Sequence, residues 1–216
     1  MKVDLLLLAG IWLLYFLIHS ILASLTVKRF IAGWRPGFMP YYRLLFNASA
    51  LVLLVPPLYL IFVDGGEPVW SWTGAMAIIA NGLALLALFG FFYSLRYYDG
   101  AEFLGMRQIR DREERVEDQE RFRISPLHRY VRHPWYFLGL VLIWTRDMPP
   151  AMLLTGIFAT LYFFMGSRLE ERKLVTYYGD VYREYLKRVP AIIPVPWRHL
   201  DKESAERLEK LSNRQG

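Results

Sequence analysis

Apolar residues in this chain gather in long runs that contain no Asp, Glu, Lys or Arg. Five such runs cover residues 5–25, 44–63, 74–95, 134–145 and 151–166. A helix needs about 20 apolar residues to cross a hydrocarbon core of about 30 Å, so the first three runs predict transmembrane helices. The last two predict a helical hairpin around residues 146–150, whose first arm reaches only about 22 Å by Met148. The pattern therefore predicts an all-α polytopic membrane bundle of about five passes.

The segments outside these runs complete the expected organisation. The first run is too long for the apolar part of a signal peptide, so we expect it to remain as a helix. Apolar residues recur at helical spacing from Tyr178 to Val189 with charges opposite, which predicts an amphipathic helix ended by Pro190. We expect three N-terminal spans in residues 1–95, a loop, hairpin and amphipathic helix forming the ligand-binding region in 96–200, and a polar tail in 201–216.

Charge divides the connecting segments into two kinds. Segments 26–43, 96–133 and 167–216 carry most of the Lys and Arg, whereas segments 64–73 and 146–150 carry few. Positive loops stay on the cytoplasmic side, so we expect the N-terminus outside and the C-terminus in the cytoplasm, in the inner membrane if the source is bacterial. Anionic lipid facing these loops accounts for the net charge of +6, and no nucleic-acid partner is required.

Composition narrows the chemistry further. The chain is 55% hydrophobic and 21% charged, and it has no cysteine. A disulfide, a thiolate nucleophile and a Cys-ligated metal are therefore excluded. His128 and His133 lie five positions apart without a third residue at convincing ligand spacing, so we expect no metal. A channel or transporter is disfavoured because the polar residues gather at one end of the spans and no inverted repeat is visible.

Three polar clusters lie at the expected cytoplasmic ends of the last spans. Residues 129–136 suit an interfacial Arg and aromatic anchor, but His followed by Pro at a helix start also suits an anion site. The pair 170–171 is unfavourable at a helix C-terminus unless it meets nearby cations in headgroup water or donors at the other arm of the hairpin. Segment 174–194 suits either a surface helix or a lid over a cytoplasmic pocket.

These clusters give the sequence a family resemblance. The run from Arg132 to Tyr136, then Gly139, the pair 170–171, the aromatic spacing through Tyr185 and the prolines after it resemble the C-terminal signature of the isoprenylcysteine carboxyl methyltransferase family. Phospholipid methyltransferases share a looser version. The N-terminal half is similar to bacterial methanethiol S-methyltransferases and NnrU-type membrane proteins. The resemblance implies an integral membrane enzyme that uses S-adenosyl-L-methionine.

The resemblance also implies residue roles. The residues expected to bind S-adenosylmethionine are Gln108, His128, Tyr130, His133, Pro134, Trp135, Tyr136, Glu170, Tyr182 and Tyr185. The residues expected to take part in catalysis are Arg132, His19 and Arg168. Two positions depart from the family pattern. His128 stands where an aromatic Tyr is expected, and Gly166 stands where an Arg linked to substrate is expected. We expect Glu170 to bind the ammonium or ribose of the methyl donor, and Arg132 with the N–H groups near His133 to meet its carboxylate.

The sequence is compatible with more than one methyl acceptor. A histidine inside a membrane span is costly unless it has a partner, so His19 either bonds to a neighbouring helix or acts as a base or orienting group for an acceptor. Asn47 and Asn81 suit helix-packing roles. The partners expected are membrane lipids and an apolar small molecule, lipid or lipidated substrate. The candidate acceptors are an isoprenylcysteine-like carboxylate, a small thiol and a phospholipid amine. A non-enzymatic NnrU-like binding protein is the alternative class.

Overall fold

A computed structural model describes residues 4–63, 66–113, 116 and 122–212. Its helices, with short 3-10 turns marked η, are α1 (Leu5–Ala23), α2 (Leu25–Trp34), η1 (Pro36–Phe38), α3 (Met39–Val63), α4 (Gly74–Ser94), η2 (Leu95–Tyr97), α5 (Gly100–Leu104), α6 (Met106–Arg110), η3 (Leu127–Arg129), α7 (Pro134–Trp144), α8 (Pro150–Arg188) and α9 (Lys202–Ser212). Within the described residues, extended pairing is limited to two isolated bridges. The predicted all-α fold is therefore confirmed.

The helices also confirm a polytopic membrane protein. Four are long and apolar enough to span a bilayer, namely α1, α3 with η1, α4 with η2, and α8, while α7 is a shorter apolar helix. Large apolar side chains on them face outward, as Leu6 (84% exposed), Phe62 (84%) and Ile78 (76%) illustrate. In water such a surface would be unstable, whereas in lipid it is the expected exterior.

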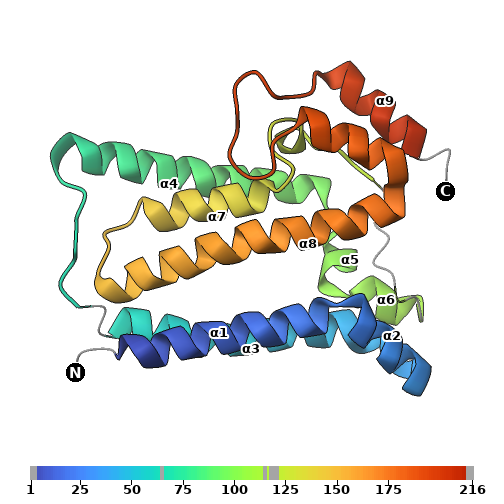
Figure 1. The fold of residues 1–216 in the computed structure, drawn as a ribbon, viewed down its shortest axis with the longest axis horizontal. Helices are drawn as coiled ribbons and strands as arrows, with labels where there is room; N and C mark the ends of the chain where they lie inside the picture. Colours follow the sequence, from blue (N-terminus) through green and yellow to red (C-terminus); the bar gives the residue numbers. More distant parts are fainter. Residues whose placement is uncertain (1–3, 64–65, 114–115, 117–121, 213–216) are drawn as a thin grey trace. The chain divides into compact units, whose positions relative to one another are not determined.

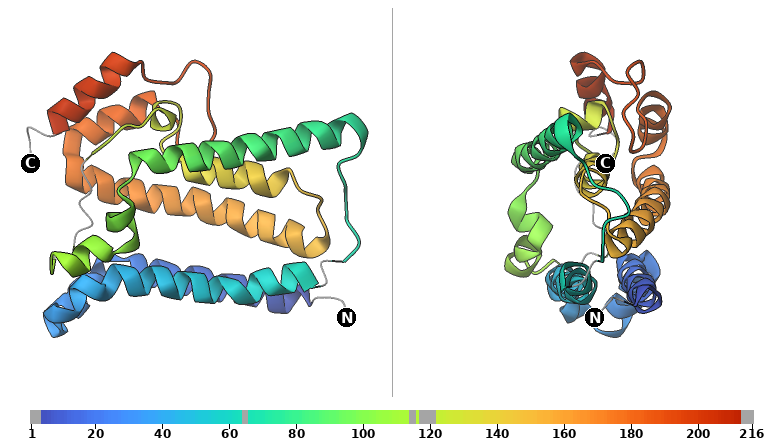
Figure 2. Two further views of the ribbon diagram at one scale, coloured as in Figure 1. Left: turned by 180° about the vertical axis from the view of Figure 1, so that it is seen from behind. Right: turned by 90° about the vertical axis from the view of Figure 1, so that its left-hand side faces the viewer.

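The chain divides into two compact units, which we describe separately. The first comprises Met1–Ser71, Tyr98–Asp118 and Asp147–Phe158, and in it α1 and α3 run side by side (Figures 1 and 2). Its core centres on Leu8 and Trp12, and the Trp12 indole donates to Thr155 Oγ1 at 3.0 Å. Ser24 ends α1 in an extended conformation and caps α2 by accepting from Val27 N at 3.3 Å.

The second unit comprises Trp72–Tyr97, Gln119–Arg146 and Ala159–Gly216, and in it α7 lies along α4 (Figure 1). The Trp135 indole donates to Ser94 Oγ at 2.7 Å, near the end of α4. Farther along, Arg146 Nη1 donates to Asn81 Oδ1 at 3.0 Å. With 11 residues α7 is only about 16 Å long, so the predicted short arm of the hairpin is confirmed.

The second arm is much longer than the predicted run 151–166. Helix α8 continues to Arg188 as one element, with a single non-helical residue at Gly179 (φ 53°, ψ −130°). Such a backbone conformation suits glycine, because it has no Cβ. The predicted amphipathic helix is thus the part of α8 after Gly179, and its apolar side contributes Tyr182, Tyr185 and Val189 to a buried cluster.

The C-terminal segment packs onto this same cluster. Helix α9 lies beside the end of α8 in both views and buries Ala205 and Leu208 against it (Figures 1 and 2). Leu200 precedes α9 and exchanges hydrogen bonds with Arg129, whose Nε donates to Leu200 O at 2.8 Å. The polar tail predicted for 201–216 therefore begins as a packed helix, and its residues 213–216 lie outside the described residues.

Candidate functional site

The start of α7 is fastened to the segment that follows α8. Pro134 occupies the first turn, where its fixed φ and missing N–H are tolerated. The backbone N–H groups of Arg132 and His133 donate to the carbonyls of Pro190 and Ala191, each at 2.9 Å. These two donors were expected to meet a ligand carboxylate. In the structure they instead fix the position of His133.

Arg132 and His133 converge on one carboxylate, that of Glu171. Arg132 Nε and Nη2 lie 2.8 and 2.7 Å from Glu171 Oε1, and His133 Nε2 lies 3.0 Å from the same oxygen. Arg132 Nη1 donates to the carbonyls of Leu186 and Val189. The Arg132 and Glu171 side chains are only 9% and 13% exposed, so this ion pair is largely shielded from solvent.

Glu170 receives a different pair of neighbours. The Tyr136 hydroxyl donates to Glu170 Oε2 at 3.2 Å, and His133 Nδ1 lies 3.5 Å from that oxygen. The Glu170 side chain is 49% exposed, in contrast to Glu171. Glu170 therefore presents a carboxylate edge that is oriented by its neighbours and still accessible to a cationic group.

His133 is held between the two glutamates and against a stack of aromatic rings. Its ring lies nearly parallel to that of Tyr136, with centroids 5.2 Å apart, and Tyr136 stacks on Phe163 of α8 at 4.8 Å. Gly139 leaves room for Phe163, because a Cβ there would lie 3.4 Å from its ring. The hairpin therefore fixes the orientation of both His133 and Tyr136.

The protonation of His133 follows from its partners. Burial by itself lowers the pKa of His133, but hydrogen bonds to Glu170 and Glu171 outweigh burial and raise the pKa above its ordinary value. Carboxylates only accept hydrogen bonds, so an imidazole with one on each ring nitrogen is best satisfied as imidazolium. The cluster of Arg132, His133, Glu170 and Glu171 then carries balanced charge.

His128 has the opposite character. Burial, and then the charge of His133, lower the pKa of His128 to about 4, and Glu170 only partly offsets them. Its Nδ1 lies 2.7 Å from Ser125 Oγ, and its carbonyl accepts from the Tyr185 hydroxyl at 2.6 Å. His128 is therefore neutral at pH 7 and linked to the cluster chiefly through charge.

The remaining predicted residues of this unit lie in different surroundings. Trp135 faces α4, and Tyr182 and Tyr185 are 2% and 3% exposed in the cluster under α9. Tyr130 is 49% exposed and stacks on His199 at 5.7 Å. Arg168 is exposed and lies two positions before Glu170, so its side chain leaves another face of α8. The structure thus brings Arg132, His133, Tyr136 and Glu170 together.

Sequence reasoning missed the role of Glu171. Of the acidic pair, the sequence pattern assigned a role only to Glu170, whose expected partners were either cations of the same helix or the donors near His133 at the start of the other arm. The helix geometry carried a signal, because Glu171 and Leu174 share a face of α8 with the buried Ser167. A charged residue on a face that turns inward requires an opposite charge, which Arg132 supplies.

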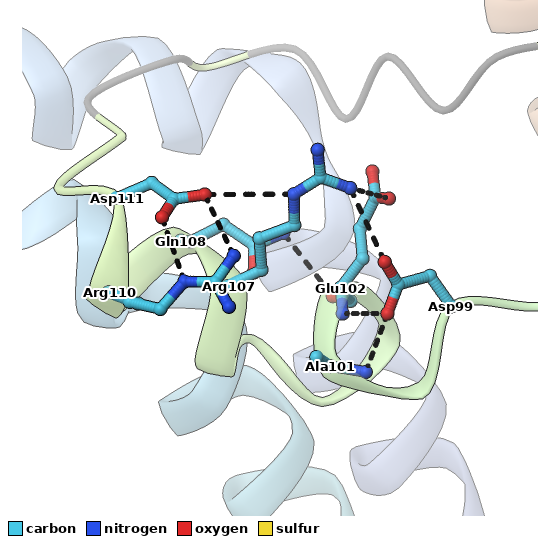
Figure 3. A network of polar contacts seen from close by, with 7 residues as sticks. All are labelled: Asp99, Ala101, Glu102, Arg107, Gln108, Arg110 and Asp111. Atoms are coloured by element: carbon cyan, nitrogen blue, oxygen red, sulfur yellow. Dashed lines mark hydrogen bonds and ion pairs between the residues drawn. The ribbon is translucent and has the colours of Figure 1, made fainter.

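Gln108 and His19 belong to the first unit. Gln108 lies on α6, beside a network of Asp99, Glu102, Arg107 and Asp111 (Figure 3). Two backbone N–H groups, those of Glu102 and Ala101, lower the pKa of Asp99. His19 lies on α1 between the rings of Tyr15 (5.8 Å) and Phe46 (4.8 Å). That these two residues contact the same ligand as Glu170 stays a prediction.

Comparison with known proteins defines the class. The family described as "Protein of unknown function (DUF1295)" matches residues 29–189. The chain is 30% identical over 186 residues to a methanethiol S-methyltransferase of Pseudomonas sp., covering 82% of this chain and 68% of that protein. It is 30% identical over 194 residues to the methanethiol S-methyltransferase of Mycobacterium tuberculosis, covering 84% and 74%.

A more distant relative extends the comparison. The protein-S-isoprenylcysteine O-methyltransferase of Schizosaccharomyces pombe is 39% identical over 77 residues, which cover 32% of this chain and 31% of that protein. No solved structure matches the chain. The chain belongs to the DUF1295 family, within the isoprenylcysteine carboxyl methyltransferase-like membrane methyltransferases. Its class of activity is methyl transfer.

Proposed function

We propose that this protein transfers a methyl group from S-adenosyl-L-methionine to an apolar or membrane-partitioned acceptor. The observation that carries the proposal is Glu170, a half-exposed carboxylate oriented by Tyr136 and His133 at the mouth of an apolar hairpin. A ligand bearing an ammonium group fits such a carboxylate. The methyltransferase names of the relatives agree with this assignment.

When bound, S-adenosylmethionine supplies a methyl group on a sulfonium that departs as a neutral thioether. In the proposed site Glu170 binds the ammonium, and His133 and Tyr136 hold Glu170 in place. Arg132 acts through Glu171, since its donors are directed at Glu171 and at the carbonyls of Leu186 and Val189. Orientation and exclusion of water provide the acceleration, so the chain needs no covalent nucleophile.

The acceptor that we favour is a small thiol. The methanethiol S-methyltransferases of Pseudomonas sp. and Mycobacterium tuberculosis align over more than four fifths of this chain, whereas the isoprenylcysteine relative aligns over a third. Gly166 also favours the thiol, because a glycine supplies no substrate-binding side chain although the position has room for one, the nearest neighbour of an added Cβ being the Tyr136 hydroxyl at 3.8 Å. An isoprenylcysteine-like carboxylate is the second candidate.

Three further roles belong to the proposal. His19 orients the acceptor or removes its proton, since an unprotonated imidazole is a suitable base near neutral pH. Gln108 contributes a further contact to the methyl donor. The N-terminus lies outside and the C-terminus in the cytoplasm, which places the His133 cluster at the cytoplasmic surface, where the donor is available.

Calorimetry with S-adenosylhomocysteine tests the donor site. We expect the wild type to bind, and Glu170→Gln to bind at least tenfold more weakly because a charge-assisted hydrogen bond is lost. Glu184→Gln is the matched control on the same helix, because Glu184 pairs with Arg188 outside the cluster. Equal affinity of Glu170→Gln and Glu184→Gln would contradict the assignment of Glu170.

The acceptor is tested separately with a labelled methyl donor. Purified protein is incubated with deuterated-methyl S-adenosylmethionine and either methanethiol or an isoprenylcysteine analogue, and the products are analysed by mass spectrometry. We expect labelled dimethyl sulfide to predominate. Labelled methyl ester in place of the sulfide would transfer the assignment to the carboxylate acceptor.

A further inference from the structure

The side-chain amide of Gln108 makes a hydrogen bond through its nitrogen but not through its oxygen, within the part of the chain that the structure describes. Its Nε2 donates to the carbonyl of Glu102 at 3.3 Å, which fixes the orientation of the amide. Its Oε1 is buried and accepts no hydrogen bond from the part of the chain that the structure describes. A buried acceptor without a donor is costly, so this oxygen suits a ligand that brings an N–H or O–H group.

The turn that carries Gln108 is built directly on the backbone of α3. Gly105 separates α5 from α6 with φ 89°, and a Cβ there would lie 2.6 Å from the backbone N of Leu44. Glycine is therefore required twice, for its conformation and for the close approach. The two short helices can hold this position on α3 only while residue 105 has no side chain.

A second contact fixes the same turn from a polar side chain inside the α3 span. Asn47 Nδ2 donates to the carbonyl of Phe103 at 2.9 Å, and Arg43 Nε donates to that carbonyl at 3.1 Å. Phe103 lies between Glu102, which binds the Gln108 amide, and Gly105. Asn47 therefore reaches the element that orients Gln108 through one hydrogen bond to its backbone.

We propose that Asn47 is a positioning residue, which holds the α5–α6 turn so that Gln108 Oε1 is presented to an N–H donor of the methyl donor. The inference rests on the proposed function, and it assigns to Asn47 a role beyond helix packing. The salt bridges of Arg107 in Figure 3 also join α5 to α6, but these side chains are 26% to 49% exposed. Exposed ion pairs contribute little, so we assign the position of the turn on α3 to the close approach of Gly105 and to the hydrogen bonds that Asn47 and Arg43 donate to the Phe103 carbonyl.

The test compares four variants by affinity for S-adenosylhomocysteine and by steady-state kinetics. Asn47→Leu removes the amide while keeping the number and branching of the side-chain heavy atoms, and Gln108→Leu removes the acceptor. The double variant combines both changes. Ser49→Ala is the matched control on α3, since Ser49 donates within its own helix to Phe46 at 2.8 Å.

We expect Asn47→Leu to weaken binding about fivefold, the magnitude of one hydrogen bond, and to raise KM for the methyl donor while KM for the acceptor is unchanged. The double variant should bind no more weakly than Gln108→Leu alone, because the two residues act in series. Ser49→Ala should match the wild type. Additive losses in the double variant, or unchanged donor affinity in Asn47→Leu, would overturn the proposal.

Hydrogen exchange separates this inference from the proposed function. If the wild type does not bind S-adenosylhomocysteine, the proposed methyl donor is wrong, and the role of Asn47 is still read from the amides of residues 100–110. Faster exchange there in Asn47→Leu, with Ser49→Ala unchanged, would retain Asn47 as the residue that holds the turn. Equal exchange rates of these amides in both variants would show that Asn47 does not hold the turn.

Discussion

Two groups of charged residues, one in each unit, differ in how far their ion pairs are exposed to solvent. Around His133, Arg132 and Glu171 are nearly covered by protein, and a single oxygen accepts from both cations. Around Arg107, three acidic groups lie 3.2 to 3.7 Å from a guanidinium that is 44% exposed. Both groups consist of several ion pairs around one cation, but only the pair of Arg132 and Glu171 is nearly removed from solvent.

That difference in exposure determines what each group contributes. Water and salt screen the Arg107 network, so loss of one member leaves groups that solvent can satisfy. No such compensation is available to Glu171, because removal of Arg132 leaves a carboxylate with little access to water. The number of ion pairs alone would predict equal contributions to stability from the two groups, whereas their burial predicts a much larger contribution from the pair of Arg132 and Glu171.

Removal of Arg132 should produce the largest effect. We expect Arg132→Met to destabilise the protein by about 3–5 kcal/mol, because Glu171 loses its strongest partner while still buried. Chemical unfolding in detergent micelles measures the change. A loss of unfolding free energy below about 1 kcal/mol is typical of exposed ion pairs, and it would show that the two charged groups contribute alike to stability.

Acidification should produce an intermediate effect through His128. The folded-state pKa of His128 is about 4, below its unfolded value, so the unfolded chain binds more protons between about pH 6.5 and 4. Stability should therefore fall as the pH is lowered through this window. The raised pKa of His133 has the opposite sign: its contribution is fully present below the unfolded pKa and is lost as the pH rises through the folded value.

Thermal unfolding at pH 7 and pH 5 separates the two histidines. We expect the wild type to unfold at a lower temperature at pH 5, and His128→Asn to show a smaller difference between the two pH values. His133→Asn should retain the acid sensitivity. An unchanged pH difference in His128→Asn would show that another group causes it.

Arg107 should give the smallest effect. We expect Arg107→Ala to change stability by less than about 1 kcal/mol, and the change to shrink further in 0.5 M salt because the pairs are exposed. The same unfolding experiment as for Arg132→Met measures it. A loss as large as that of Arg132→Met would mean that the α5–α6 turn depends on its surface charges.

Much of the fold could be predicted because the bilayer imposes a simple rule on the sequence. Charge-free runs of about 20 residues gave the long spans, and the 12-residue run gave the short helix α7. The extent of α8 could not be predicted in this way. The charge-free run 151–166 and the amphipathic spacing from Tyr178 to Val189 predicted its two ends, but neither pattern predicted that they belong to one helix, whose last part packs Tyr182 and Tyr185 into a buried cluster.

The sequence by itself determined the membrane class of this protein, the hairpin that opens at Pro134, and the polar residue types gathered at its mouth. These features follow from local patterns of apolar and charged positions. Only the tertiary structure decided which charges meet. It paired Arg132 with Glu171 rather than with a ligand, left Glu170 accessible, and placed Asn47 under the turn that carries Gln108. Pairing depends on distances between segments far apart in the chain, and those distances are set by helix packing.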